Sequence, residues 1–174
     1  TYVVAGTTNG CTTIDSVTIY VKPLPVITIE GDGKGENRDS ICYSDEINLT
    51  ASGAGEKGMY TWNTGIINDV LTVSPLNTTN YTVVGTDTFG CAKDTTFTVG
   101  VIPLPSFEIK GQELICQNDT NKIWLEYEDK SLTFEWAGTY EMDGDTIFPK
   151  VENNESYIVT AKDIYQCAKT KSLG

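Results

Sequence analysis

Five cysteines are the residues of this 174-residue chain whose type and spacing point most directly to chemistry. Two thiols in reach of each other can be oxidised to a disulfide, and a thiolate can also bind a metal ion. The chain has no histidine, so it lacks the commonest general base and the usual partner of a catalytic cysteine or serine. Structural pairing is therefore the first role to consider for these cysteines.

The cysteines follow a repeat of about 80 residues, and such repeats define tandem units. Three similar segments each end in a cysteine: YVVAGTTNGC (2–11), YTVVGTDTFGC (81–91) and YIVTAKDIYQC (157–167). Cys42 and Cys116 are each followed 20 residues later by a tryptophan, and VKPLP (21–25) returns as VIPLP (101–105). Each unit thus has one early and one late cysteine, and it begins after Pro-Leu-Pro.

This register predicts three parts. Residues 1–25 are expected to be the C-terminal hairpin of a preceding repeat, and 26–105 a complete repeat. Residues 106–174 are expected to be a second repeat that is truncated at its last strand. The two Pro-Leu-Pro segments fall at the unit boundaries, where proline favours a stiff, extended linker.

The segments between the cysteines have the composition of short strands. Runs of five to seven residues rich in Val, Ile, Thr, Tyr and Phe alternate with Gly, Asn, Asp and Pro. Ile47, Leu49 and Ala51 are expected to share one inward face, and no segment keeps a helical apolar period. The sequence predicts an all-β protein of tandem immunoglobulin-like β-sandwiches with about seven strands each.

The register also predicts two disulfides within units, Cys42 with Cys91 and Cys116 with Cys167, and leaves Cys11 unpaired. Closing a loop of about 50 residues would stabilise a small unit by roughly 4 kcal/mol. The alternative is that all five thiols are free. Disulfides persist in oxidising compartments, so we expect an extracellular protein, either secreted or displayed on the cell surface.

The net charge of −12 disfavours nucleic acid as a partner, because an acidic surface repels phosphates. No apolar run is long enough to predict insertion into a membrane. Two acidic loops are candidates for Ca²⁺, and a solvated loop is the alternative in both cases. Their carboxylates are Asp32, Glu36 and Asp39 in GDGKGENRD, and Asp143 and Asp145 in MDGDT. No other metal or cofactor is predicted.

Trp124 is a candidate ligand contact. In NKIWLEY the register aligns its neighbours Ile123 and Leu125 with inward positions, so Trp124 is expected to face outward. An exposed aromatic ring can stack on a sugar or on a partner side chain. The alternative is a ring covered by a neighbouring loop or by the adjacent unit.

The pattern YTW…LTVSP…TTNYTVVGTDTFGC…TTFTVGVIPLP resembles the PKD-like or Ig-like repeats of very large secreted Bacteroidetes proteins, including gliding-motility surface adhesins. The resemblance covers the whole chain and is strongest over 41–105. In the second unit, DGDTIFPKVENNES replaces one strand pattern and Gln166 replaces the glycine before the late cysteine. The resemblance implies a repeated β-sandwich in a stalk, export, and cell-surface display, and it carries no catalytic residues.

In such a source, Asp-Ser or Asp-Thr segments are candidate O-glycosylation sites, here at Ser16, Ser40, Thr95 and Thr146. Three functions remain open: a structural and adhesive stalk module, a carbohydrate-binding module, and an accessory domain of a secreted hydrolase. The partners expected are neighbouring repeats, surface glycans or other surface proteins. No enzyme activity is predicted within the chain, because its carboxylates show no recognisable catalytic arrangement.

Overall fold

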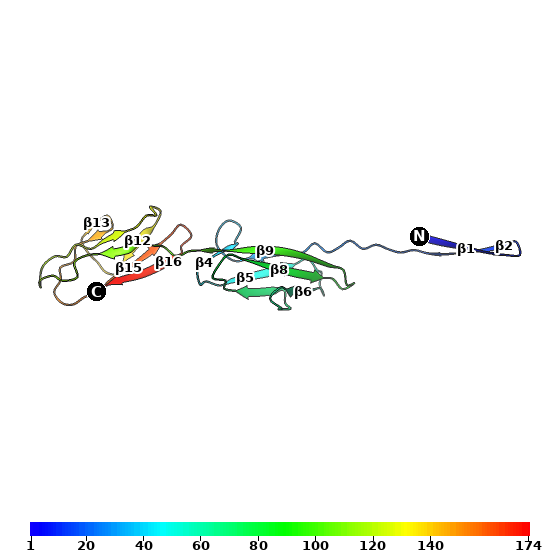
Figure 1. Ribbon diagram of the computed structural model, residues 1–174, viewed down its shortest axis with the longest axis horizontal. Helices are drawn as coiled ribbons and strands as arrows, with labels where there is room; N and C mark the ends of the chain where they lie inside the picture. Colours follow the sequence, from blue (N-terminus) through cyan, green and yellow to red (C-terminus); the bar gives the residue numbers. More distant parts are fainter.

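The computed structural model describes residues 1–174 as an elongated, all-β chain (Figure 1). A hairpin at one end is followed by an extended segment and then by two sandwich units in line. The hairpin strands are β1 (Tyr2–Thr8) and β2 (Cys11–Val17). The structure contains no helix of the length and apolarity that a membrane crossing requires.

The first sandwich unit has seven strands in two sheets, ordered β3-β5-β7 and β4-β9-β8-β6. All neighbours are antiparallel except β4 and β9, which run parallel. The strands are β3 (Thr28–Gly31), β4 (Ser40–Cys42), β5 (Ile47–Ser52), β6 (Met59–Trp62), β7 (Val70–Val73), β8 (Thr79–Thr86) and β9 (Ala92–Ile102). The predicted β-sandwich class is thereby confirmed for this part of the chain.

Alternation along the strands builds the core between the sheets. Along β5 the burial pattern alternates residue by residue, and Ile47, Leu49 and Ala51 are all buried, as predicted. Facing them are Val83 of β8 and Val99 of β9, each fully buried. This period of two is what a sheet needs when one face is dry and the other is wet.

The second unit follows a related plan with shorter strands, and it has no strand at the position of β4. One sheet has the order β12-β15-β16, while β10 pairs with β11 and β13 with β14. A bridge between Ile123 and Ile147 joins the edges of these two small sheets. The strands are β10 (Glu108–Lys110), β11 (Trp124–Glu126), β12 (Thr133–Trp136), β13 (Met142–Asp143), β14 (Thr146–Ile147), β15 (Tyr157–Lys162) and β16 (Ala168–Leu173).

The second core is separate from the first. Its centre consists of Ile123, Ile147, Val159 and Ala161, none of which is exposed. Trp136 occupies the place that Trp62 has in the first core. The indole N–H of Trp62 donates to the carbonyl of Asn68 at 2.9 Å, whereas that of Trp136 has no partner. Each unit therefore has its own hydrophobic core, which is what an independent domain requires.

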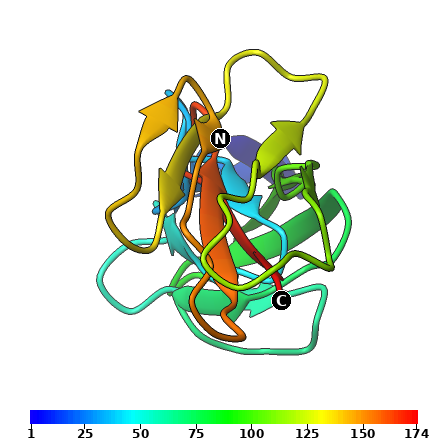
Figure 2. The same cartoon turned by 90° about the vertical axis from the view of Figure 1, so that its left-hand side faces the viewer.

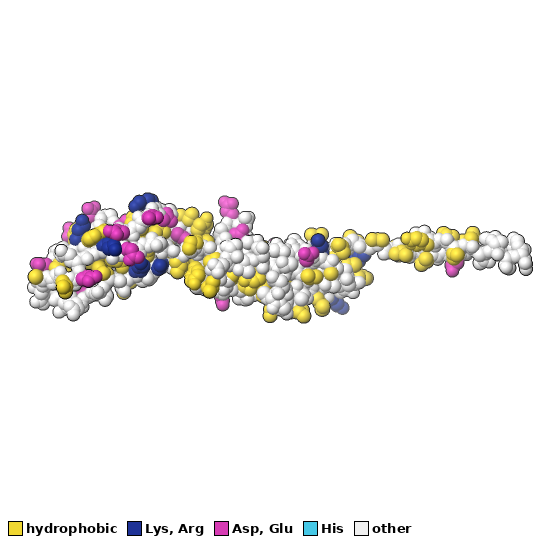
Figure 3. All heavy atoms as spheres, viewed as in Figure 1, with side chains coloured by type: hydrophobic (Ala, Val, Ile, Leu, Met, Phe, Trp, Pro, Cys, Tyr) yellow, Lys and Arg dark blue, Asp and Glu magenta, His cyan; other side chains and the backbone are white.

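The β1–β2 hairpin belongs to neither core. The two-residue turn Asn9-Gly10 joins its strands, and both residues have positive φ. Tyr2 and Val4 are 68% and 66% exposed, although the register aligns them with the buried Tyr81 and Val83. Figure 3 shows apolar side chains along this ribbon and near the junction of the two sandwiches.

The two units are stacked end to end rather than side by side. β4 lies at the end of the first unit that faces the second (Figure 1), and the view along the long axis shows one unit in front of the other (Figure 2). The segment Pro103–Pro105 connects them. The arrangement brings the last residues of β9 next to the turn between β15 and β16.

Candidate functional site

A disulfide between Cys42 and Cys167 joins the two units. The two Cα atoms are 5.4 Å apart, although 125 residues separate the cysteines in the sequence. Both side chains are buried, with 4% of Cys42 and none of Cys167 exposed. With the backbone of the linker, the disulfide gives this junction a second covalent connection.

The predicted pairings Cys42–Cys91 and Cys116–Cys167 are wrong, because Cys91 and Cys116 are unpaired. The predicted pairings require both cysteines of a unit to lie at the same end of its sandwich. In the structure, Cys42 is the β-sheet partner of Ile102. Ile102 lies at the far end of the 11-residue strand β9, which starts beside Cys91. At about 3.3 Å per residue this separation is about 35 Å, and a disulfide requires Cα atoms within about 7 Å.

The early cysteine is held by β4. This three-residue strand runs parallel to the end of β9, with Cys42 opposite Ile102. A turn follows at once, in which the backbone N–H of Asp45 donates to the carbonyl of Cys42 at 2.9 Å. These contacts fix the backbone of Cys42 at the end of the first unit.

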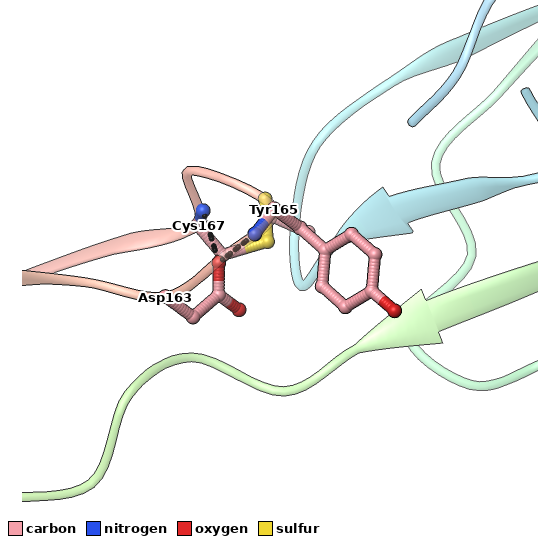
Figure 4. The surroundings of a disulfide bond; sticks show 4 residues. Asp163, Tyr165 and Cys167 are labelled. Carbon is pink, nitrogen blue, oxygen red and sulfur yellow. Dashed lines mark hydrogen bonds between the residues drawn. A yellow bond between two sulfur atoms is a disulfide. The ribbon is translucent and has the colours of Figure 1, made fainter. Parts of the chain in front are cut away.

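The late cysteine is held by a turn built on Asp163. One carboxylate oxygen of Asp163 accepts hydrogen bonds from the backbone N–H groups of Tyr165 and Cys167, both at 2.8 Å. Figure 4 shows this turn with the Tyr165 ring directed toward the strands of the first unit. Tyr165 and Ile102 line the same shallow hollow as the loop of residues 35–40. The turn thus presents both the Cys167 sulfur and an aromatic ring to the preceding unit.

The first unit contains the same turn. Asp87 accepts from the N–H groups of Phe89 and Cys91, both at 2.9 Å. The sequence carries the signal for this turn, because DTFGC (87–91) and DIYQC (163–167) share the Asp and Cys spacing, although the repeat register alone assigns no role to these aspartates. The residue before each cysteine has a positive φ, 82° for Gly90 and 65° for Gln166.

Exchanging the residue before the late cysteine between the two units is expected to change the stability of the units in opposite directions. Gln166→Gly is expected to stabilise the second unit by about 1 kcal/mol, because a side chain is unfavourable in the left-handed region. Gly90→Gln is expected to destabilise the first unit by about the same amount. Urea denaturation of both variants measures the changes, and two shifts of the same sign would contradict this reading of the turn.

A cleft of about 850 Å³ lies at the end of the second unit that faces the junction. Its apolar floor includes Leu104, Phe107 and Leu132, and its rim carries Glu126, Glu128, Asp129 and Asp163. The first unit has a matching but smaller groove of about 510 Å³, lined by its own linker Lys22–Pro25 and by Asp87. The linker therefore packs against the following unit in the same way at both places.

An ion pair fixes the linker in the first of these grooves. The ammonium of Lys22 donates to Asp87 at 2.5 Å and lies 3.6 Å from the centre of the Phe89 ring. The Lys22 hydrogen bond lowers the pKa of Asp87, and the N–H groups of Cys91 and Phe89 lower it further. Because the folded-state pKa is depressed, this pair stabilises the protein above the ordinary pKa of aspartate. That contribution is lost as the pH falls through the lowered pKa.

Lys22→Met is therefore expected to raise the pKa of Asp87 toward the ordinary aspartate value. An NMR titration of the carboxyl carbons measures this shift directly. Lys93→Met is a suitable control, because Lys93 lies 3.7 Å from Asp94 and makes no ion pair with Asp87. Equal Asp87 titration curves in the wild-type and Lys22→Met proteins would exclude the ion pair.

The candidate calcium residues do not gather around a point, and no group of three or more carboxylates, cysteines or histidines is placed to hold a metal. Asp32 accepts from the backbone and side-chain amides of Asn48, which lowers its pKa. Asp39 accepts from the Ser40 hydroxyl, and Asp145 accepts from the hydroxyl of Tyr127. Glu36, in the loop between β3 and β4, and Asp143, at the end of β13, are both exposed.

Trp124 lies on the outer face of β11, opposite the buried Leu125, in the orientation that the register predicts. Its side chain is 36% exposed, and the Lys122 ammonium lies 5.9 Å from the centre of its ring. Of the candidate glycosylation residues, Ser16 is exposed, while three are partly buried: Ser40, Thr95 and Thr146.

No protein-family model matches the chain, and no curated protein matches it. Several solved structures are similar to it, and three of them are named here. Fibronectin(III)-like modules of Clostridium thermocellum CbhA align over 84% of this chain and 91% of theirs, with 16% identity and a TM-score of 0.38. The human desmocollin-1 ectodomain aligns over 96% of this chain and 39% of its own, with 20% identity and a TM-score of 0.30.

The third similar structure is Bacteroides ovatus SGBP-B from a mixed-linkage glucan utilization locus, in complex with a heptasaccharide. It aligns over 75% of this chain and 41% of its own, with 13% identity and a TM-score of 0.29. This chain therefore spans about two-fifths of the length of the second and third structures.

Proposed function

We propose that the chain is a non-catalytic structural and adhesive repeat module, part of the stalk of a large cell-surface or secreted protein. The observation that carries this proposal is the junction, where two sandwich units meet end to end and are joined by both the linker and the Cys42–Cys167 disulfide. A single flexible linker would leave the units free to pivot. Two connections restrict that motion and keep the long axes of the units in line.

A stalk has to transmit force along its length without losing its shape. Pulling on this chain loads the junction through Pro103–Pro105 and through the disulfide in parallel. The linker adds stiffness, because two of its three residues are proline, with restricted φ. The apolar contacts at the start of the second unit, where Pro105 and Phe107 are buried, hold the linker against that unit.

Three observations support the finer proposal of an extracellular stalk. The disulfide is of the kind that persists in oxidising surroundings. The sequence resembles repeats of large Bacteroidetes surface proteins, among them gliding-motility adhesins. In the cleft beside the junction, Ser131 donates both its hydroxyl and its backbone N–H to one oxygen of Asp129, which is the pattern of a local turn rather than of an activated nucleophile, so binding and spacing suit this surface better than catalysis does.

Small-angle X-ray scattering tests the proposal on the complete chain. The oxidised protein is expected to scatter as a rod whose maximum dimension matches the structure. Addition of a reductant is expected to broaden the distribution of dimensions, because only the linker then restrains the two units. Identical scattering curves before and after reduction would show that the disulfide does not hold the units in line, and the stalk proposal would lose its main support.

A carbohydrate-binding module, alone or as an accessory domain of a secreted hydrolase, is the second candidate function. Trp124 favours it, because a partly exposed indole on an outer strand face can stack on a sugar ring. Trp124→Ala is expected to abolish binding on a glycan array if this function is correct. Tyr43→Ala is the matched control, since Tyr43 is also a partly exposed aromatic residue. Absence of glycan binding by the unaltered chain would eliminate this candidate.

A further inference from the structure

Cys91 sits in a turn that has the same hydrogen bonds as the turn of the disulfide-bonded Cys167. In both turns an aspartate accepts from the N–H groups of the aromatic residue and of the cysteine. In both, the aspartate N–H donates to the cysteine carbonyl, at 2.9 Å for Asp87 and 3.1 Å for Asp163. The first unit therefore presents a thiol in the geometry that forms an interunit disulfide in the second.

The surroundings of Cys91 differ from those of Cys167 chiefly in burial, because no unit covers the other side of the Cys91 turn. Cys167 is fully buried by its contact with the preceding unit, while Cys91 is partly exposed. Phe89, the counterpart of Tyr165, is 76% exposed against 46% for the tyrosine. The turn of the first unit thus has the open surface that the preceding unit covers in the second.

The segment with which a strand equivalent to β4 would pair is also present. In the formed junction, β4 pairs with residues 100–102, and this pairing places Cys42 beside Cys167. The register aligns 100–102 with 20–22, where Tyr20 and Val21 are 89% and 92% exposed and lie in no strand. Lys22, the counterpart of Ile102, already contacts Phe89 and Asp87. Lys22 therefore lies against the turn of Cys91, as Ile102 lies beside Tyr165 in the turn of Cys167, while Tyr20 and Val21 remain open.

We propose that Cys91 forms a second interunit disulfide, and that its partner is the early cysteine of another unit of this repeat. The strand of that unit equivalent to Ser40–Cys42 pairs with the 20–22 edge and brings its cysteine to Cys91. The inference rests on the proposed function in one respect, that the chain works as a series of units. It adds a rule: the early cysteine of each unit bonds the late cysteine of the next.

The rule assigns a role to Cys116 as well. Its carbonyl accepts from the N–H of Asp119 at 3.1 Å, as the carbonyl of Cys42 accepts from Asp45. Cys116 is exposed and is the early cysteine of the second unit. Cys116 would form a disulfide with the late cysteine of a following unit. Every interior junction of a longer array would then carry one disulfide.

The reaction is the oxidation of two thiols. The two sulfur atoms bond, and two protons and two electrons leave. A low-molecular-weight disulfide accepts them and becomes two thiols; oxidised glutathione serves in the test. No group of the chain itself has to act as an acid or a base, because solvent can carry the protons from the protein thiols to the glutathione thiolates.

The test is a chain in which residues 26–105 occur twice in succession between the unchanged segments 1–25 and 106–174. After refolding with oxidised glutathione, alkylation and peptide mapping should find Cys42 of the first copy bonded to Cys91 of the second. Cys42 of the second copy should be bonded to Cys167. The Cys91 thiol of the second copy should lose its reactivity completely, while that of the first copy stays reactive.

Matched variants assign the bonds, since the two copies yield identical peptides. Cys91→Ser in the first copy alone should leave both disulfides intact. Adding Cys42→Ser in the first copy alone should release Cys91 of the second copy as a reactive thiol and preserve the bond to Cys167. A reactive Cys91 in the second copy, with the bond to Cys167 formed, overturns the proposal. That result leaves the stalk function standing, because scattering of the unaltered chain tests it separately.

Discussion

Cys42→Ser is expected to lower the free energy of unfolding by about 5 kcal/mol and to separate one coupled transition into two. The disulfide closes a loop between residues 125 apart, and chain entropy assigns a loop of that length about 5 kcal/mol. The bond also links two separate hydrophobic cores, so its loss removes the restraint that makes one unit sense the unfolding of the other.

Urea denaturation followed by tryptophan fluorescence measures this effect, because Trp62 reports on the first core and Trp136 on the second. Cys91→Ser is the matched control: it removes a partly exposed, unpaired thiol from the equivalent turn and is expected to change stability by less than about 0.5 kcal/mol. Cys167→Ser should reproduce Cys42→Ser. If Cys42→Ser and Cys91→Ser unfold alike, the disulfide does not couple the units.

Strand positions and inward residues could be predicted from the sequence, because they depend on local alternation. Ile47, Leu49 and Ala51 alternate with polar residues in a strand paired on both sides, and a period of two leaves one choice of buried face. The outward direction of Trp124 followed from the same logic, applied through the repeat register. These features need no knowledge of how distant segments meet.

The disulfide could not be predicted in the same way. The repeat register shows which residues of the units are equivalent, but it does not show which residues lie close together. The deciding contact is the parallel pairing of the three-residue β4 with the end of β9, and three residues are too few to show a pattern. Knowledge of this contact places Cys42 and Cys91 at opposite ends of the unit. The repeat itself then offers the late cysteine of the next unit as the nearest partner.

The junction therefore depends on features that lie at the ends of strands. At one end, β4 and the end of β9 present Cys42 and Ile102. At the other end, an aspartate-centred turn presents a cysteine and an aromatic ring to the preceding unit. A unit that carries both ends can be joined on both sides, which is the requirement for a linear array.

Gly53→Ala is expected to destabilise the first unit by about 3 kcal/mol, the second large effect that the structure predicts. Gly53 follows β5 with a φ of 100°, where a side chain is unfavourable. A Cβ atom there would lie 1.9 Å from the carbonyl oxygen of Val26 and 2.9 Å from its carbonyl carbon. These are backbone atoms, so relief requires a shift of the chain where it enters the unit.

Gly55→Ala separates the two causes. Gly55 has a similar φ of 87°, but a Cβ atom there would meet nothing within 4 Å. This variant should therefore lose only about 1 kcal/mol from backbone strain, and the difference between the two alanine variants measures the clash with Val26. Urea denaturation followed by tryptophan fluorescence, to which Trp62 contributes the signal of the first core, gives both values, and equal losses would show that Val26 moves away freely. A shift of Val26 would displace its buried neighbour Ile27 and the adjoining linker, so Gly53→Ala should also weaken the Lys22–Asp87 contact and raise the pKa of Asp87.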